Sequence, residues 1–244
     1  MKTLQIILLT LASLSGCTKK TDTTKAVSIN NQTKTDSVSM VNANPLTYLA
    51  LGDSYTIGQS VPQAQSFPYQ LTGLLNADSV SVETPTIIAT TGWTTDNLIN
   101  AIASSGLTGK KYSFVTLLIG VNDQYQGLSI DNYKIKFAQV LNTAIAFANG
   151  DASRVFVLSI PDYGVTPFAG GQDAVIGPEI DAFNAANYVI SFKAGVNYLN
   201  ITGISKQAAT HLNLVAGDGL HPSGAMYALW MQQLAPLVLA KVKN

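Results

Sequence analysis

The chain has 244 residues, and its 14 Lys plus Arg are balanced by 14 Asp plus Glu, so its formal net charge is zero. This balance excludes the strong basic excess with which nucleic-acid-binding proteins attract phosphates, and no nucleic-acid partner is expected. The single cysteine excludes an internal disulfide.

The first residues have the features of an export signal. Lys2 precedes an apolar run over residues 4–14, which is shorter than the roughly 20 residues of a permanent membrane span. The run ends in the tetrapeptide LSGC, which resembles the lipobox of bacterial lipoproteins, in which the cysteine is acylated after cleavage. We therefore expect a signal peptide over residues 1–16 and a lipid anchor on Cys17. An ordinary signal peptide with an incidental cysteine is the alternative.

By the same resemblance, Thr18 after the cysteine favours the outer membrane, facing the periplasm or the cell surface. Residues 17–44 are rich in Thr, Ser, Asn and Lys and contain no aromatic residue, which is typical of a flexible tether. The remaining residues, 45–244, are enough for one domain with a sizeable core.

After Pro45, short apolar runs alternate with longer stretches of helical period, a pattern that predicts an α/β fold with a parallel sheet. Strands are expected over residues 46–51, 87–90, 114–119, 155–160 and 198–201. Helices are expected over residues 67–76, 95–104, 132–149, 179–193 and 223–242. Pro178 suits the first turn of the fourth of these helices, and Ser223 suits the N-cap of the last.

Four short blocks lie just beyond predicted strands or in the loop before the last helix. They are Gly52-Asp53-Ser54-Tyr55, Gly92-Trp93, Gly120-Val121-Asn122-Asp123 and Asp218-Gly219-Leu220-His221-Pro222. A serine hydroxyl needs a base to become a nucleophile, and of the two histidines only His221 has an acidic partner nearby, Asp218. His211 has no local partner and is expected to be a surface or core histidine.

In order and content, these blocks resemble those of the SGNH hydrolases, the GDSL-type esterases and lipases. The resemblance covers the chain from about Leu46 to its end, and it departs from the family name at Tyr55, where the fourth letter calls for Leu. It implies a three-layer flavodoxin-like sandwich with a five-stranded parallel sheet in the order 2-1-3-4-5. It also implies a catalytic set of Ser54, Asp218 and His221 and an oxyanion hole formed by Ser54, Gly92 and Asn122.

The resemblance further implies a serine esterase that cleaves carboxylic oxygen esters through an acyl-enzyme, without cofactor or metal. The substrate could carry a short acyl chain, be an acetylated carbohydrate or be a lysophospholipid, and the protein is expected to be a monomer held at the membrane by its lipid. A surface lipoprotein that binds glycans or lipids on the same scaffold without turnover is the alternative function.

Other residues near the blocks have two interpretations each. Trp93 and the stretch 162–177, with Tyr163 and Phe168, could shape the substrate pocket or pack in the core. Asp53 and Asp123 adjoin tight turns, where aspartate commonly binds its own backbone, and are expected to be structural. Neither nucleotide-binding glycine pattern occurs, and no Cys or His cluster suggests a metal site.

Overall fold

The structure is a computed structural model that describes residues 44–243. Its centre is a parallel sheet of five strands in the order β2-β1-β3-β4-β5. The strands are β1 (Tyr48–Gly52), β2 (Thr86–Ala89), β3 (Phe114–Leu118), β4 (Val155–Leu158) and β5 (Asn197–Leu199). Both the predicted strands and the predicted strand order are confirmed.

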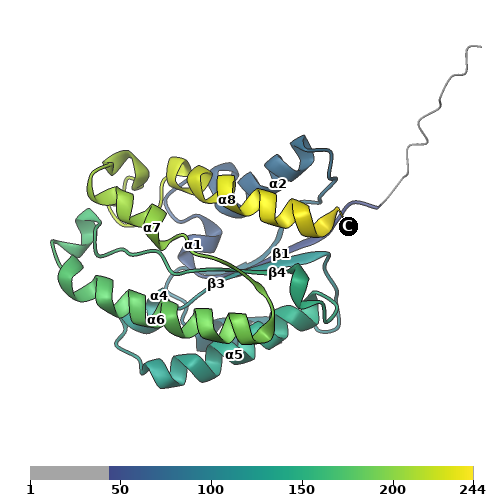
Figure 1. The fold of residues 1–244 in the computed structure, drawn as a ribbon, viewed down its shortest axis with the longest axis horizontal. Coiled ribbons are helices and arrows are strands. Elements are labelled where there is room, and N and C mark those ends of the chain that lie inside the picture. Colours follow the sequence, from purple (N-terminus) through teal and green to yellow (C-terminus); the bar gives the residue numbers. More distant parts are fainter. Residues whose placement is uncertain (1–43, 244) are drawn as a thin grey trace, which may run out of the picture. The chain divides into compact units, whose positions relative to one another are not determined.

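The sheet is covered by helices on both faces, as Figure 1 shows. Helices α2 (Phe67–Ala77) and α8 (Gly224–Val242) pack together on one face, and α3 (Thr95–Ser104), α5 (Ile130–Phe147) and α6 (Asp173–Ala194) pack on the other. Every residue of β1, β3 and β4 is buried, as expected of parallel strands that lie between two helical layers. The three-layer α/β prediction is confirmed.

The start of α6 was predicted wrongly. The helix begins at Asp173 and therefore contains Pro178, which was expected to lie in its first turn. Proline usually forces the preceding residue out of the helical region, because its ring crowds the Cβ of that residue. Here the preceding residue is Gly177, which has no Cβ, so the helix continues through the proline at the loss of one backbone hydrogen bond.

Three short helices were also missed: α1 (Ser54–Ile57), α4 (Val121–Tyr125) and α7 (Thr202–Ser205). Each has one turn or little more, which is too short for a hydrophobic period to be recognised. At the end of the chain, the predicted cap is confirmed, since the Ser223 hydroxyl accepts the backbone N–H of Met226 at 3.3 Å.

Within residues 44–243, no helix is both long enough and apolar enough to cross a membrane. The predicted signal peptide, the lipidated Cys17 and all of the tether but its last residue lie outside the described residues.

Candidate active site

The predicted nucleophile lies at the carboxyl end of the central strand. Gly52 ends β1, and Ser54 begins α1 two residues later. A side chain at Gly52 would collide with Thr56 and with the backbone oxygen of Leu118, so glycine lets the short helix pack against the sheet. Asp53 caps this helix, because its Oδ1 accepts the N–H of Tyr55 at 3.0 Å. Ser54 is thereby held in a defined turn, with only 4% of its surface exposed.

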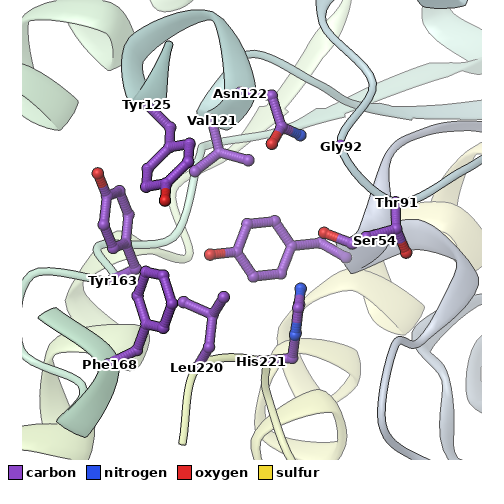
Figure 2. A pocket seen from close by; sticks show the side chains of 11 residues that line it. Ser54, Thr91, Gly92, Val121, Asn122, Tyr125, Tyr163, Phe168, Leu220 and His221 are labelled. Carbon is purple, nitrogen blue, oxygen red and sulfur yellow. The ribbon is translucent and has the colours of Figure 1, made fainter. Parts of the chain in front are cut away.

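The predicted base is held by its predicted carboxylate. His221 Nδ1 lies 2.6 Å from Asp218 Oδ2, while the backbone N–H groups of Leu220 and His221 each donate to Oδ1 at 3.0 Å. With Nδ1–H donating to a carboxylate, the neutral ring presents Nε2 as a proton acceptor. In Figure 2 the ring extends from its loop toward Ser54.

Asp218 is set up to stay ionised. Partial burial opposes its charge, but hydrogen bonds from Ser60, His221 and the backbone of Leu220 outweigh burial and hold its pKa well below the usual range. A permanently charged carboxylate behind the ring stabilises the imidazolium that forms when the base takes a proton.

Two further predicted residues line the other side of the same space. Gly92 has a φ of +81°, a conformation that favours glycine, and a Cβ there would have no heavy atom within 4 Å. Asn122 lies in the first turn of α4, and its Nδ2 donates to the backbone oxygen of Trp93 at 3.0 Å. That bond fixes the amide, which has two N–H groups, and leaves the second as a donor for a bound molecule.

A cavity of about 230 Å³ joins these groups. Ser54, Gly92, Asn122 and His221 all line it (Figure 2). Asp218 contacts His221 from behind, so every predicted site residue except Cys17 is brought to one place. The rest of the lining is mainly apolar or aromatic: Tyr55, Thr91, Val121, Tyr125, Tyr163, Phe168 and Leu220. One end of the cavity therefore carries the polar, reactive groups, and its other walls are mainly apolar.

The structure decides between the two interpretations of the aromatic residues. Phe168 lines the cavity, and Tyr163 both lines it and belongs to the buried core. Trp93 does not line it: this side chain packs against the core, and its backbone oxygen accepts the Asn122 amide. His211 is exposed, with its Nδ1 near Thr210 Oγ1 at 2.9 Å, as expected for a surface histidine.

Two features of the site were missed from the sequence. Tyr125 reaches the cavity because it lies four residues after Val121 on the same helix, a pairing that a prediction of α4 would have revealed. Ser60 donates to Asp218 Oδ2 at 2.6 Å across a separation of 158 residues, and no pattern in the sequence predicts that contact.

Asp53 and Asp123 do not line the cavity, in keeping with their predicted structural roles. Asp53 is fully buried, which raises its pKa to about 8. Asp123 was predicted to bind its own backbone in a turn. Instead, its Oδ2 accepts both the N–H and the hydroxyl of Thr95, each at 2.9 Å. It thereby ties α4 to the start of α3. Burial raises the pKa of this carboxyl as well.

In the described part of the chain, no group of three or more His, Cys, Asp or Glu side chains is arranged to hold a metal ion.

Comparison with known proteins places this geometry in a family. A family model described as "GDSL-like Lipase/Acylhydrolase family" matches residues 50–229. No match was found among curated proteins.

Solved structures share the fold at low identity. The psychrotrophic esterase EstA from Pseudoalteromonas sp. is 16% identical, with a TM-score of 0.62, and the match covers 82% of this chain and 100% of that one. TesA is 19% identical, with a TM-score of 0.62 and coverage of 80% and 99%. Axe2, an acetylxylan esterase from Geobacillus stearothermophilus, is 16% identical, with a TM-score of 0.59 and coverage of 82% and 94%. The fold and the family model agree: the chain belongs to the GDSL-like lipase/acylhydrolase family and is a serine ester hydrolase.

Proposed function

We propose that the protein hydrolyses carboxylic oxygen esters through an acyl-enzyme on Ser54. The observation that carries this proposal is the 2.6 Å contact between His221 and Asp218 at the edge of a cavity that Ser54 also lines. As Ser54 Oγ attacks the ester carbon, His221 Nε2 takes its proton, and the imidazolium then returns that proton to the departing alcohol oxygen. Water repeats the sequence on the acyl-enzyme and releases the acid.

The negative charge that develops on the carbonyl oxygen needs donors that are already in place. The backbone N–H groups of Ser54 and Gly92 and the free N–H of the Asn122 amide are proposed for this role. Their support is that all three residues line one end of the cavity, and that Asn122 is held by Trp93.

For the acyl part of the substrate, the cavity favours a short chain. Its apolar remainder suits an acyl group, and its volume of about 230 Å³ is small. At the end away from Ser54, it is bounded by three aromatic side chains that also line a second cavity of about 500 Å³: Tyr125, Tyr163 and Phe168. We call these three the aromatic wall.

The small cavity supports short-chain esters, including acetylated carbohydrates, over the long acyl chain of a lysophospholipid. The acetylxylan esterase among the similar structures acts on a substrate of the favoured kind, although at 16% identity that likeness supports the fold only. We further propose that the enzyme acts as a monomer, exported and anchored through a lipid on Cys17 to the outer membrane. The proposed export and anchor rest on the sequence around that cysteine.

Labelling with a fluorophosphonate tests the reaction, because such probes react with an activated serine. Wild-type protein should be labelled at Ser54 and should hydrolyse a short-chain ester, whereas Ser54→Ala should lose both properties and keep its melting temperature. Ser104→Ala, an exposed serine in the last turn of α3, is the matched control and should behave as wild type.

Recovery of the label on another serine would overturn the assignment. A folded wild type that binds glycan or lipid but neither reacts with the probe nor turns over esters would favour the non-catalytic alternative.

A further inference from the structure

Ser60 contacts the carboxylate of the acid-base pair from the nucleophile's own segment. It follows Ser54 by six residues, just past Gly58, which ends α1. Its hydroxyl donates to Asp218 Oδ2 at 2.6 Å, and the same oxygen lies 2.6 Å from His221 Nδ1. One carboxylate oxygen is thus shared between the base and a serine from the opposite loop.

The backbone at Ser60 is in an unfavourable conformation. Its φ is +66°, in the left-handed region, which costs a residue with a Cβ about 1 kcal/mol or more. The turn is fixed on both sides, because Gln59 N–H donates to Ser54 O at 3.0 Å and Val61 N–H donates to Gly58 O at 3.2 Å. Strained residues of this kind cluster at functional sites, where the surrounding structure holds them.

The segment around Ser60 also contacts the loop that carries Gly92. Gln59 Oε1 accepts the hydroxyl of Thr91 at 2.7 Å, next to Gly92. Residues 59 and 60 therefore contact both the glycine loop and the Asp218 loop.

We propose that Ser60 is a positioning residue, which ties the segment of the nucleophile to the loop of the base and shares the Asp218 oxygen that orients His221. This inference rests on the proposed function. The Ser60 hydroxyl stabilises negative charge on Oδ2. When the hydroxyl is removed, the charge on Oδ2 is left to the imidazole alone, so the protonated ring is favoured. The loop of Asp218 also loses its link to the segment of the nucleophile, so the base is positioned less firmly.

Other titratable groups also face the pair formed by Asp218 and His221. The Tyr55 ring packs edge-on against the His221 ring at 5.8 Å, and the Tyr227 hydroxyl donates to the Tyr55 backbone oxygen at 3.0 Å. Burial raises the pKa of both phenols well above the usual value, so they stay neutral. Asp53, Asp162 and Tyr163 lie near Tyr55, and Asp162 also pairs with Lys206. None of them is altered by a substitution at Ser60.

The test uses three variants of the full chain. Ser60→Ala removes the hydroxyl, and Ser60→Gly removes it while relieving the backbone, because glycine adopts positive φ freely. Ser60→Asn keeps an N–H donor on a residue that tolerates this conformation. The matched control is the pair Ser79→Ala and Ser79→Gly, since Ser79 is also exposed with a φ of +64° but lies in the turn after α2.

For Ser60→Ala and Ser60→Gly, kcat on a short-chain ester should fall about threefold to tenfold with KM nearly unchanged, as for an exposed hydrogen bond to a charged group. The acidic limb of the pH profile should move to higher pH. Ser60→Asn should keep most of the wild-type rate. Both Ser79 variants should match wild type in rate and pH profile.

A second measurement does not depend on activity. The chain has two histidines, so an NMR titration resolves them. In Ser60→Ala and Ser60→Gly the midpoint of His221 should move to higher pH, while that of His211 should stay in place. Unchanged His221 titration together with an unchanged rate would overturn the role of Ser60. If the wild type itself shows no turnover, the proposed function fails, and the His221 titration still decides whether Ser60 acts on the pair.

Discussion

Asp53, the residue before the nucleophile, has a carboxyl group in an unusual environment. It is fully buried, and its Oδ2 has no hydrogen-bond partner, while Oδ1 accepts one backbone N–H. Burial disfavours the charged form, which is why its pKa is raised to about 8. At neutral pH this carboxyl is therefore mainly protonated, unlike Asp218.

The raised pKa predicts a pH-dependent stability. A carboxyl whose pKa is higher in the folded than in the unfolded protein contributes fully below about pH 4, and that contribution is lost as the pH rises to about 8. Asp53→Asn cannot ionise, so its free energy of unfolding should rise relative to wild type across this window and then level off.

Denaturant unfolding at a series of pH values measures this difference. Asp131→Asn is the control, because the hydrogen bond from Lys134 lowers the pKa of Asp131, so this carboxyl is ionised above about pH 5 in both states and the difference from wild type should stay constant from there to pH 8. A constant difference between Asp53→Asn and wild type from pH 4 to 8 would contradict the assignment.

Asn122 supports a prediction about the rate. Loss of its amide in Asn122→Ala should lower kcat about 10²- to 10³-fold with little change in KM, because the amide is proposed to bind the oxyanion more strongly than the ester. Since the same amide also donates to Trp93 O, stability should fall by about 1 kcal/mol.

Steady-state kinetics and thermal melting on one preparation separate these two effects. Gln126→Ala is the control, because Gln126 donates to Gly92 O in the same loop at 3.4 Å but does not line the cavity. A destabilised but fully active Asn122→Ala would remove this residue from the oxyanion hole.

At the scale of elements, the aromatic wall joins parts of the chain that are distant in sequence. Tyr125 lies on α4, and Phe168 lies in the short helix η3 (Pro167–Ala169). Their ring centroids are 6.2 Å apart, and Phe168 N–H donates to Gly219 O at 2.9 Å in the loop of the base. The position of η3 thus affects both the depth of the cavity and the surroundings of His221.

The wall should limit the length of the acyl chain. For wild type, kcat/KM should rise by up to about fourfold per methylene, from about 0.8 kcal/mol of burial each, and fall once the chain meets the rings. In Tyr125→Ala and Phe168→Ala the cavity opens toward its larger neighbour, so the optimum should move to longer chains.

Hydrolysis of a series of acyl esters of one alcohol measures this optimum. Tyr188→Ala, an equally exposed tyrosine on α6 outside the cavity, should leave the optimum where it is. An unchanged optimum in both wall variants would show that the wall does not limit the acyl chain.

At the scale of the whole molecule, the domain and its proposed anchor can be separated. Cells fed a labelled fatty acid should transfer the label to wild-type protein and to the control Thr18→Ser, but not to Cys17→Ala. The unlipidated variant should leave the membrane fraction and keep full esterase activity, because all other site residues lie between Ser54 and His221. Equal labelling of wild type and Cys17→Ala would contradict the lipoprotein proposal.

The sequence by itself determined the order of strands and helices and the edge of the sheet at which the site lies. Apolar runs that alternate with helical stretches predicted the five strands. The signal is strongest for the central strands β1, β3 and β4, because strands covered on both faces are apolar along most of their length. The blocks around Ser54, Gly92 and Asn122 could be placed together for a general reason: the carboxyl ends of neighbouring parallel strands meet at one edge of a sheet. The contact between Asp218 and His221 was predictable because it is local in the chain.

Only the tertiary structure decided the contacts between distant side chains. Ser60 meets Asp218, Asp123 meets Thr95, and Tyr125 meets Phe168 because loops from different strands pack together, and no local pattern encodes those meetings. The start of α6, by contrast, has a local cause that was overlooked in the sequence: Gly177 removes the clash by which Pro178 would have ended a helix. Hydrophobic periods specify which face of an element is buried, whereas partners within a site depend on how whole elements pack.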